Sequence, residues 1–173
     1  RIEDEERRFN INNVPEEILD NIEILDFRTA EAILDRTRKN DESDAQPFVA
    51  VEELLFLHNM DEEVFVGENG QPGLRDIFTV YGDGKVNINT ASRAVLMAIP
   101  DMDEDSIEVV LAFLSGPDQE RNTPDDVMIS SLATLQSELK LDPAVVSLLD
   151  RYCKTESEFY RIIGYSTRRG GRV

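Results

Sequence analysis

GKVNINTASRAVLMAIPDMDEDSIEVVLAFLSG, residues 84–116, has the pattern of two helices joined by a tight connection. A short polar turn precedes the first apolar run, the connection lies at 99–101, and a second apolar run follows. One face of the second run recurs at i, i+3, i+4 and i+7, the spacing of a buried helix face: Ile107, Val110, Leu111 and Leu114. The stretch therefore predicts a helix-hairpin-helix unit, a scaffold that suits nucleic-acid binding.

The same pattern occurs earlier in the chain. Residues 9–34, FNINNVPEEILDNIEILDFRTAEAIL, align without a gap on residues 86–111, VNINTASRAVLMAIPDMDEDSIEVVL. A second unit follows each copy, VEELLFLHNMDEEVF at 51–65 and LATLQSELKLDPAVV at 132–146. Because self-similarity at a fixed offset indicates a repeat, the sequence predicts a duplicated pair of helical hairpins.

Each copy opens with the triplet Asn-Ile-Asn. Alternation predicts a short extended stretch in which Ile11 or Ile88 faces the core, while the flanking Asn side chains bond backbone groups at the turn. Core packing and turn formation explain the triplets without any ligand.

Polar residues at the expected helix starts predict caps. Asn13 and Thr90 are expected to cap the first helix of each hairpin, with Asn13 and Glu16 spaced as a capping-box pair. The second helices are expected to start at Asp26 and Asp103, where a carboxylate suits the positive helix end.

Both charge and hairpin composition argue against nucleic acid. A hairpin of this kind meets phosphate through backbone N–H groups and needs small residues, usually Gly-hydrophobic-Gly, in its connection. Those positions hold Asp101 and Asp103 in one copy and Ile24 and Asp26 in the other. The formal net charge of −18 also repels phosphate at long range. We therefore predict no nucleic-acid binding.

The basic residues cluster in three places: Arg7-Arg8, Arg36 to Lys39, and Arg168 to Arg172. We interpret these clusters as solvated surface or tail, because Lys and Arg are usually exposed.

No motif for catalysis is evident. Cys153 is the only cysteine, which excludes an internal disulfide and a CxxC site, and it is expected to be a small buried residue. His58 is the only histidine and is expected at a helix end. Acidic pairs such as Asp125-Asp126 and Glu52-Glu53 are interpreted as charged surface. The sequence predicts that the protein is not an enzyme.

Strand signals predict an α+β fold. They lie at 7–12, at 76–89, where a β-hairpin is expected to turn at 82–84, and at 158–173. Polar loops are expected at 40–47 and 116–126. The predicted organisation is a small antiparallel sheet from residues 1–12 and 155–173, with a large helical domain, 13–154, inserted between them.

These motifs, in this order, resemble the minor pseudopilin K family of the type II secretion system, the general secretion pathway protein K family. The resemblance rests on DEERRFNINN, PFVAVEELLFLHNMDEEVF, LRDIFTVYGDGKVNINTASRAVLMAIP and SEFYRIIG, and it spans nearly the whole chain. The NINT-type motif by itself also resembles small competence-type DNA-binding proteins. A competence-type helix-hairpin-helix module that binds nucleic acid is therefore the alternative.

The pseudopilin resemblance implies a pilin-like sheet with an inserted helical domain. It further implies an N-terminal membrane helix preceding RIEDEERR, and a place at the tip of a periplasmic pseudopilus anchored in the bacterial inner membrane. The expected partners are other minor pseudopilins of the same system, and the expected role is structural, in protein export across the outer membrane.

The resemblance also implies calcium. Asp101, Asp103 and Asp105 have the D-x-D-x-D opening of an EF-hand loop, but Ser106 and Ala112 replace the expected Gly and Glu, so we interpret the run as an acidic helix start. Oxygen ligands are also offered by the 116–126 loop: Asp118, Glu120, Asp125 and Asp126. No metal ligand is assigned.

Overall fold

The structure, a computed structural model, describes residues 1–38, 46–121 and 123–165. Groups of short helices lie between short strands in an α+β fold, as the sequence predicts. The helices are α1 Glu16–Asp20, α2 Phe27–Thr37, α3 Glu62–Val66, α4 Leu74–Ile77, α5 Arg93–Met97, α6 Glu104–Leu114, α7 Leu135–Leu139 and α8 Pro143–Tyr152. The 3-10 helices are η1 Glu5–Arg7, η2 Val51–Phe56 and η3 Leu132–Thr134. The strands are β1 Ile2–Asp4, β2 Phe9–Asn10, β3 Phe78–Thr79, β4 Val86–Asn87, β5 Cys153–Lys154 and β6 Tyr160–Ile162.

The strands form three separate pairs. β1 and β6 are antiparallel, whereas β2 pairs with β3 and β4 pairs with β5 in parallel. Of the antiparallel sheet expected from residues 1–12 and 155–173, only the β1–β6 pair is present, because β2 pairs in parallel with β3 instead. The expected β-hairpin at 76–89 does not form. β2 and β4 each pair with a strand that returns after a group of helices, and a connection of that length permits the parallel pairing.

Two halves of the chain share one order of elements. Residues 9–79 run from β2 through α1, α2, η2 and α3 to β3, with α4 added before the last strand. Residues 86–154 run from β4 through α5, α6, η3 and α8 to β5, with α7 added after η3. The strand ladders are extended in the same way, by Ile11 N–H to Thr79 O and Ile88 N–H to Lys154 O, both at 2.9 Å.

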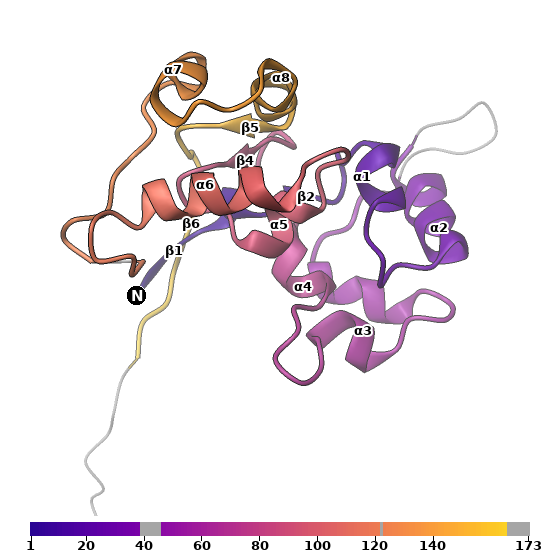
Figure 1. The fold of residues 1–173 in the computed structure, drawn as a ribbon. Helices are drawn as coiled ribbons and strands as arrows, with labels where there is room; N and C mark the ends of the chain where they lie inside the picture. The colour runs from indigo at the N-terminus through magenta and orange to yellow at the C-terminus, as the bar shows by residue number, and fades with distance from the viewer. Residues whose placement is uncertain (39–45, 122, 166–173) are drawn as a thin grey trace, which may run out of the picture.

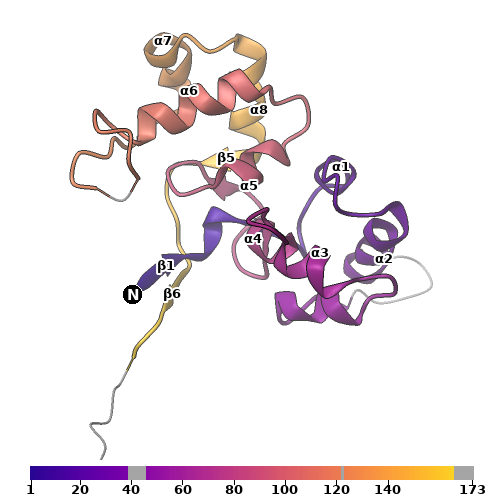
Figure 2. The same cartoon turned by 60° about the horizontal axis from the view of Figure 1, so that its bottom comes forward.

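In space the halves form two helical groups (Figure 1). Helices α1, α2 and α3 lie on one side, and α6, α7 and α8 lie on the other, with α4 and α5 between them. The β1–β6 pair extends from the α5–α8 side, as the turned view also shows (Figure 2). One cluster of buried side chains includes residues of both halves, among them Phe9, Ile11, Phe78, Ile88 and Leu96.

The Asn-Ile-Asn turns form as predicted. Ile11 and Ile88 are fully buried. The Asn10 side-chain oxygen accepts the Asn12 N–H at 3.0 Å, and the Asn87 oxygen accepts the Asn89 N–H at the same distance. The triplets therefore brace the entry to each half.

The caps expected at Asn13 and Thr90 are wrong. The residues before the first helical residue are Pro15 in α1 and Ser92 in α5, and the Ser92 hydroxyl accepts the Val95 N–H at 3.3 Å. The chain first buries Val14 or Ala91 after each turn, so each helix begins two residues later than its polar signal suggests.

The second helices do start at Asp26 and Asp103, as predicted. Three of the four positions on the predicted face of α6 are buried, Ile107, Val110 and Leu114, and Leu111 packs partly buried against the core. Cys153 is buried, as expected. Within the described ranges, no helix combines the length and apolar character needed to cross a bilayer.

Candidate functional site

The antiparallel pair β1–β6, which we call the terminal ribbon, joins two segments at opposite ends of the sequence. Its register places Ile2 opposite Ile162 and Asp4 opposite Tyr160. Arg1 and Ile163 exchange N–H to O bonds at 2.9 and 2.8 Å, and the Glu5 N–H bonds to Phe159 O at 3.0 Å. Because hydrogen-bonded pairs alternate with others in antiparallel strands, the backbone groups of Ile2, Asp4, Tyr160 and Ile162 face the outer edges.

Large apolar side chains are exposed on this ribbon. Ile2 and Ile162 are 70% and 79% exposed although they lie opposite each other. Tyr160 and Phe159 are also exposed, and the Phe159 ring stacks on Tyr81 with centroids 6.1 Å apart. Large apolar side chains exposed on a strand pair are typical of a surface that binds another protein.

Glu6 anchors the ribbon to the body. Its Oε2 accepts the Glu158 and Phe159 N–H groups at 2.5 and 3.3 Å, and its Oε1 accepts the Lys154 ammonium at 2.5 Å. Burial lowers the pKa of Lys154, but hydrogen bonds to Glu6 and Asp83 outweigh this and raise it above its ordinary value. The carboxylate is 1% exposed, so this ion pair is largely shielded from water.

A glycine turn closes over Glu6. Gly82 has φ +89°, and a Cβ there would lie 2.6 Å from Glu6 Oε1. The Gly82 carbonyl also accepts the Asn10 side-chain amide at 2.6 Å. The turn at 82–84 thus covers the buried acid instead of closing the expected β-hairpin.

Glu5 is the second buried acid at the base of the ribbon. It accepts bonds from Arg8 at 2.5 Å and the Thr79 hydroxyl at 2.8 Å, and it lies 2.5 Å from Arg161 Nε. Burial lowers the pKa of the Arg8 guanidinium, and the charge of Glu5 opposes that shift. The expectation that Arg7-Arg8 is solvated surface is therefore wrong for Arg8, because its cation pairs with a carboxylate inside the fold.

Asp4 connects the ribbon to the second half. Its Oδ1 accepts the Glu6 N–H at 2.9 Å. Its Oδ2 accepts three side-chain bonds, from Asn87 at 3.2 Å, Thr90 at 2.5 Å and Ser157 at 2.7 Å. Both oxygens are thus used, and the side chain of Thr90 serves here instead of capping α5.

Sequence reasoning missed this acidic hub, Asp4-Glu5-Glu6, because consecutive acids usually lie in water. The only local signal was the i, i+3 spacing of Glu5 and Arg8, which suits an ion pair on a helical turn. The remaining partners come from residues 79 to 161, which no local pattern connects to the N-terminal segment.

The hairpin positions that would meet phosphate are filled by the protein itself. Asp26 Oδ1 accepts the Arg28 and Thr29 N–H groups at 2.9 and 3.1 Å. Asp103 Oδ1 accepts the Ser106 N–H at 2.8 Å. Side-chain hydrogen bonds from Thr29 and Ser106, followed by the backbone bonds, lower the pKa of the two carboxyls. At neutral pH an anion would therefore face a carboxylate at both helix starts.

Several of the acids considered for calcium are engaged in local bonds. Asp118 accepts the Glu120 N–H at 2.8 Å, and Asp125 accepts the Asp118 N–H at 3.2 Å and the Thr123 hydroxyl at 2.7 Å. The Thr123 bond is the main cause of a lowered Asp125 pKa. Within residues 1–38, 46–121 and 123–165, no group of three or more acidic, His or Cys side chains is arranged to hold a metal ion. Calcium binding stays a prediction without assigned ligands.

The two residues considered for nucleophilic chemistry occupy ordinary positions. His58 is exposed just after η2. Burial raises the pKa of the Cys153 thiol to about 12, so this group is protonated at neutral pH and is a poor nucleophile.

The remaining basic clusters have separate surroundings. Arg36 pairs with Glu53 and stacks on Phe48, and Arg38 pairs with Glu16 at 3.0 Å. The cluster at 168–172, and residues 39–45 with most of the expected loop at 40–47, lie outside the described residues.

Comparisons with known proteins place no further constraint on the site. No protein-family model, curated protein or solved structure matches the chain.

Proposed function

We propose that the chain is a minor pseudopilin of the K type, a structural subunit at the tip of the type II secretion pseudopilus. The observation that carries the proposal is the terminal ribbon, which is built from both ends of the sequence and exposes apolar side chains. A role in assembly needs such a surface and needs no catalytic group.

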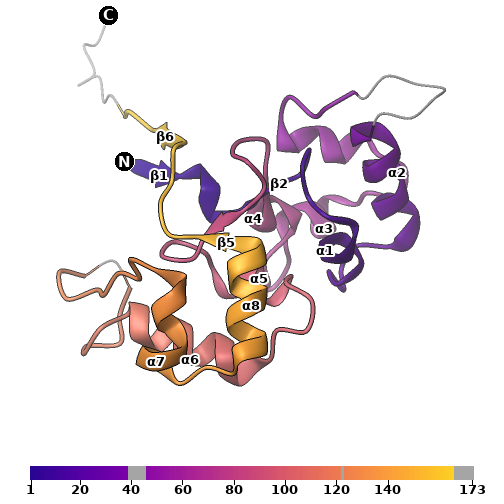
Figure 3. The same ribbon diagram turned by 90° about the horizontal axis from the view of Figure 1, so that it is seen from above.

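The arrangement of the chain supports this proposal. Residues before β2 and after β5 meet in the terminal ribbon, and the helices between them extend away from it (Figure 3). In the proposed organisation the ribbon belongs to a pilin-like sheet, and residues 13–154 are a helical domain inserted into it. The shared element order and the matching Asn contacts support the interpretation of that domain as duplicated helix-hairpin-helix-like units.

The size of the inserted helical domain favours a position at the tip of the filament. A filament subunit at the tip has no neighbour above it, so a large inserted domain is tolerated there, whereas in the shaft the domain would block the next subunit. In this proposal the protein is anchored in the inner membrane by an N-terminal helix that precedes Arg1. Its globular part lies in the periplasm. The helical groups then face outward, and the ribbon faces the partner subunits.

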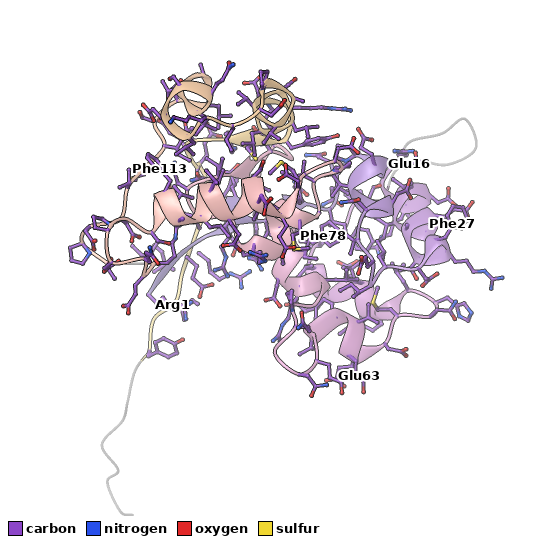
Figure 4. The ribbon with its side chains drawn as sticks, in the orientation of Figure 1. Arg1, Glu16, Phe27, Glu63, Phe78 and Phe113 are labelled. Carbon is purple, nitrogen blue, oxygen red and sulfur yellow. The ribbon has the colours of Figure 1, made fainter. Side chains whose placement is uncertain are left out.

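The partners we propose are the other minor pseudopilins of the same system. The globular domains of this chain and of its cognate partners are to be co-expressed and separated by size exclusion with light scattering. We expect a hetero-complex to form. The double variant Ile2→Asp, Ile162→Asp should abolish it, because assembly would then bury two carboxylates in place of two isoleucines that are exposed in the free protein. The matched control is Phe27→Asp, since Phe27 is 73% exposed on the outward helix α2 and should not affect assembly (Figure 4).

Failure to form any complex, even with the native N-terminal helix restored, would contradict the pseudopilin proposal. A complex that Phe27→Asp disrupts and the ribbon variant leaves intact would place the interface on the helical groups instead.

The alternative role, a nucleic-acid-binding module, is tested separately. We predict no measurable affinity for DNA at physiological salt, because Asp26 and Asp103 fill the helix starts and the net charge is −18. Fluorescence anisotropy with a labelled duplex checks this prediction. Micromolar binding that weakens as salt increases would favour the competence-type module.

A further inference from the structure

A small pocket at the base of the terminal ribbon is lined mainly by aromatic rings. It is a cavity of about 180 Å³ between η1, the segment after β3 and the start of β6, lined by Glu5, Tyr81, Phe159, Tyr160 and Arg161. The three aromatic residues are 45%, 43% and 55% exposed, in that order. Three rings that the core does not bury are therefore accessible around one cavity.

The aromatic walls are held in place by contacts within the protein. The Phe159 ring stacks on Tyr81 at an interplanar angle of 28°, and the Phe159 backbone is bonded to both Glu5 and Glu6. The Tyr160 hydroxyl donates to the Ser157 carbonyl at 3.0 Å. The rings thus lose little freedom when a ligand enters, which lowers the entropic cost of binding.

The charged groups of the pocket are paired with each other. Glu5 is buried between two guanidinium groups, those of Arg8 and Arg161, and Arg161 remains about half exposed at the edge of the cavity. A Lys or Arg side chain entering the pocket would meet these cations and a carboxylate that is already paired. A carboxylate would lose its hydration against three aromatic rings. The pocket therefore favours an uncharged occupant.

An aromatic side chain matches all of the walls. Its edge or offset face can contact the three rings, and its electron-rich face is attracted to the Arg161 guanidinium. An aliphatic side chain fills the same space but has no such electrostatic complementarity. The cavity is also smaller than the roughly 300–1,000 Å³ of sites that hold whole small molecules, so it suits a single side chain.

We propose that this pocket binds an aromatic side chain presented by a partner subunit. The inference rests on the proposed function, since it specifies how a partner is anchored at the terminal ribbon. Tyr160 belongs both to the pocket and to the exposed apolar side chains of the ribbon, so the anchor would lie at the edge of the proposed assembly surface. A second copy of this chain is disfavoured as the partner, because two molecules of charge −18 repel each other.

The test uses N-acetyl-tryptophanamide, titrated into isotope-labelled protein and followed by the NMR shifts of the backbone amides. We expect saturable shifts at the lining residues. Tyr81→Ala should weaken binding roughly tenfold, because it removes one wall and the ring that stacks on Phe159. The matched control is Tyr165→Ala, since Tyr165 is 81% exposed beyond β6 and does not line the pocket.

Two further comparisons keep the test independent of the stability of one variant. Phe159→Leu keeps an apolar wall but removes its ring, and it should weaken binding by a smaller factor than Tyr81→Ala. N-acetyl-leucinamide should bind the wild type about fivefold more weakly than the tryptophan probe, because it cannot interact with the rings and the guanidinium as an aromatic group does. Melting curves check that each variant is folded.

Several results would overturn the inference. These are the absence of saturable shifts at the lining residues, equal weakening by Tyr81→Ala and Tyr165→Ala, and equal affinity for the leucine and tryptophan probes. Shifts at the same amides that appear when the free protein is concentrated would assign the pocket to a second copy instead.

The partner complex separates this inference from the proposed function. In the hetero-complex, Tyr81→Ala should weaken the affinity for the partner domains roughly tenfold. If the complex forms with unchanged affinity, the pocket inference fails and the subunit role stands. If no hetero-complex forms under any condition, the subunit role fails, while the probe titration still decides whether the pocket accepts an aromatic ring.

Discussion

The two halves of the chain, residues 9–79 and 86–154, share a framework and differ in what that framework holds. In both, the second Asn of the triplet reaches across to a later segment: Asn12 exchanges bonds with the Phe48 backbone at 3.0 and 2.7 Å, and Asn89 does so with the Ile129 backbone at 2.9 and 2.7 Å. The first Asn differs. Asn10 donates to the Gly82 carbonyl, whereas Asn87 donates to Asp4 and Ser157 at the base of the ribbon.

The difference separates the contacts that build each half from the contacts that connect it to the terminal ribbon. Contacts present in both halves, the triplet turns, the Asp caps and the parallel strand pairs, are needed to form a half. The terminal ribbon is attached mainly by contacts found only in the second half, those of Asn87, Thr90 and Lys154, with Thr79 of the first half as a further partner of Glu5. The acidic hub therefore holds the ribbon, chiefly against the second half.

The largest effect is expected at the hub. Glu6→Ala removes the partner of the Lys154 ammonium and of two backbone N–H groups, so we expect a loss of about 3 kcal/mol in the free energy of unfolding. Chemical denaturation measures it, with exposed Glu158→Ala as the control for removing one negative charge. A loss no larger than that of the control would show that the ribbon does not depend on this buried ion pair.

The next effect compares the two halves directly. Asn89 is buried and makes an additional bond to the Thr155 carbonyl at 3.0 Å, whereas Asn12 is half-buried. We expect Asn89→Ala to cost about 2 kcal/mol and Asn12→Ala about 1 kcal/mol. Thermal melting of both variants, and of Asn87→Ala, checks the order. Variants that melt like the wild type would contradict the structural role of the triplets.

The smallest effect concerns pH and should be equal in the two halves. The pKa values of Asp26 and Asp103 are lowered by folding, so their contribution to stability is present above the unfolded-state pKa and is lost as pH falls through the folded-state pKa. Asn is also a good cap but does not titrate near neutral or acidic pH. The variants Asp26→Asn and Asp103→Asn should therefore lose less melting temperature than the wild type between about pH 6 and about pH 3.

Melting temperatures measured across that range decide the point. Parallel curves for wild type and both variants would show that the two caps do not contribute to the acid sensitivity of the fold. A change in only one variant would show that the two hairpins are not equivalent.

The helical part of the fold could be predicted from sequence because its signals are local. The apolar period of α6 and the carboxylates of Asp26 and Asp103 act within one or two turns, and both predictions are confirmed. The strand pairs could not be predicted in the same way. Phe9 pairs with Phe78 and Val86 with Cys153, and two-residue strands have no periodicity that identifies their partner.

The candidate site was predictable only in outline. The expectation that the two ends share strands agrees with the terminal ribbon, although β1 begins at Ile2 and not at residue 7. The burial of Glu5, Glu6 and Arg8 was not predictable, because a run of charges resembles a solvated surface until its distant partners are known. Those partners include Thr79, Lys154 and Arg161, which the fold alone brings to the N-terminal segment.

Amide hydrogen exchange of the protein, with and without its cognate partner domains, tests whether the terminal ribbon is the proposed assembly surface. We expect slower exchange in the complex at the outer-edge amides of Ile2, Asp4, Tyr160 and Ile162, whose N–H groups do not bond across the ribbon. Exchange in α2 should be unchanged, because that helix is proposed to face outward. Protection that appears in α2 and is absent from the ribbon would show that the ribbon is not the assembly surface.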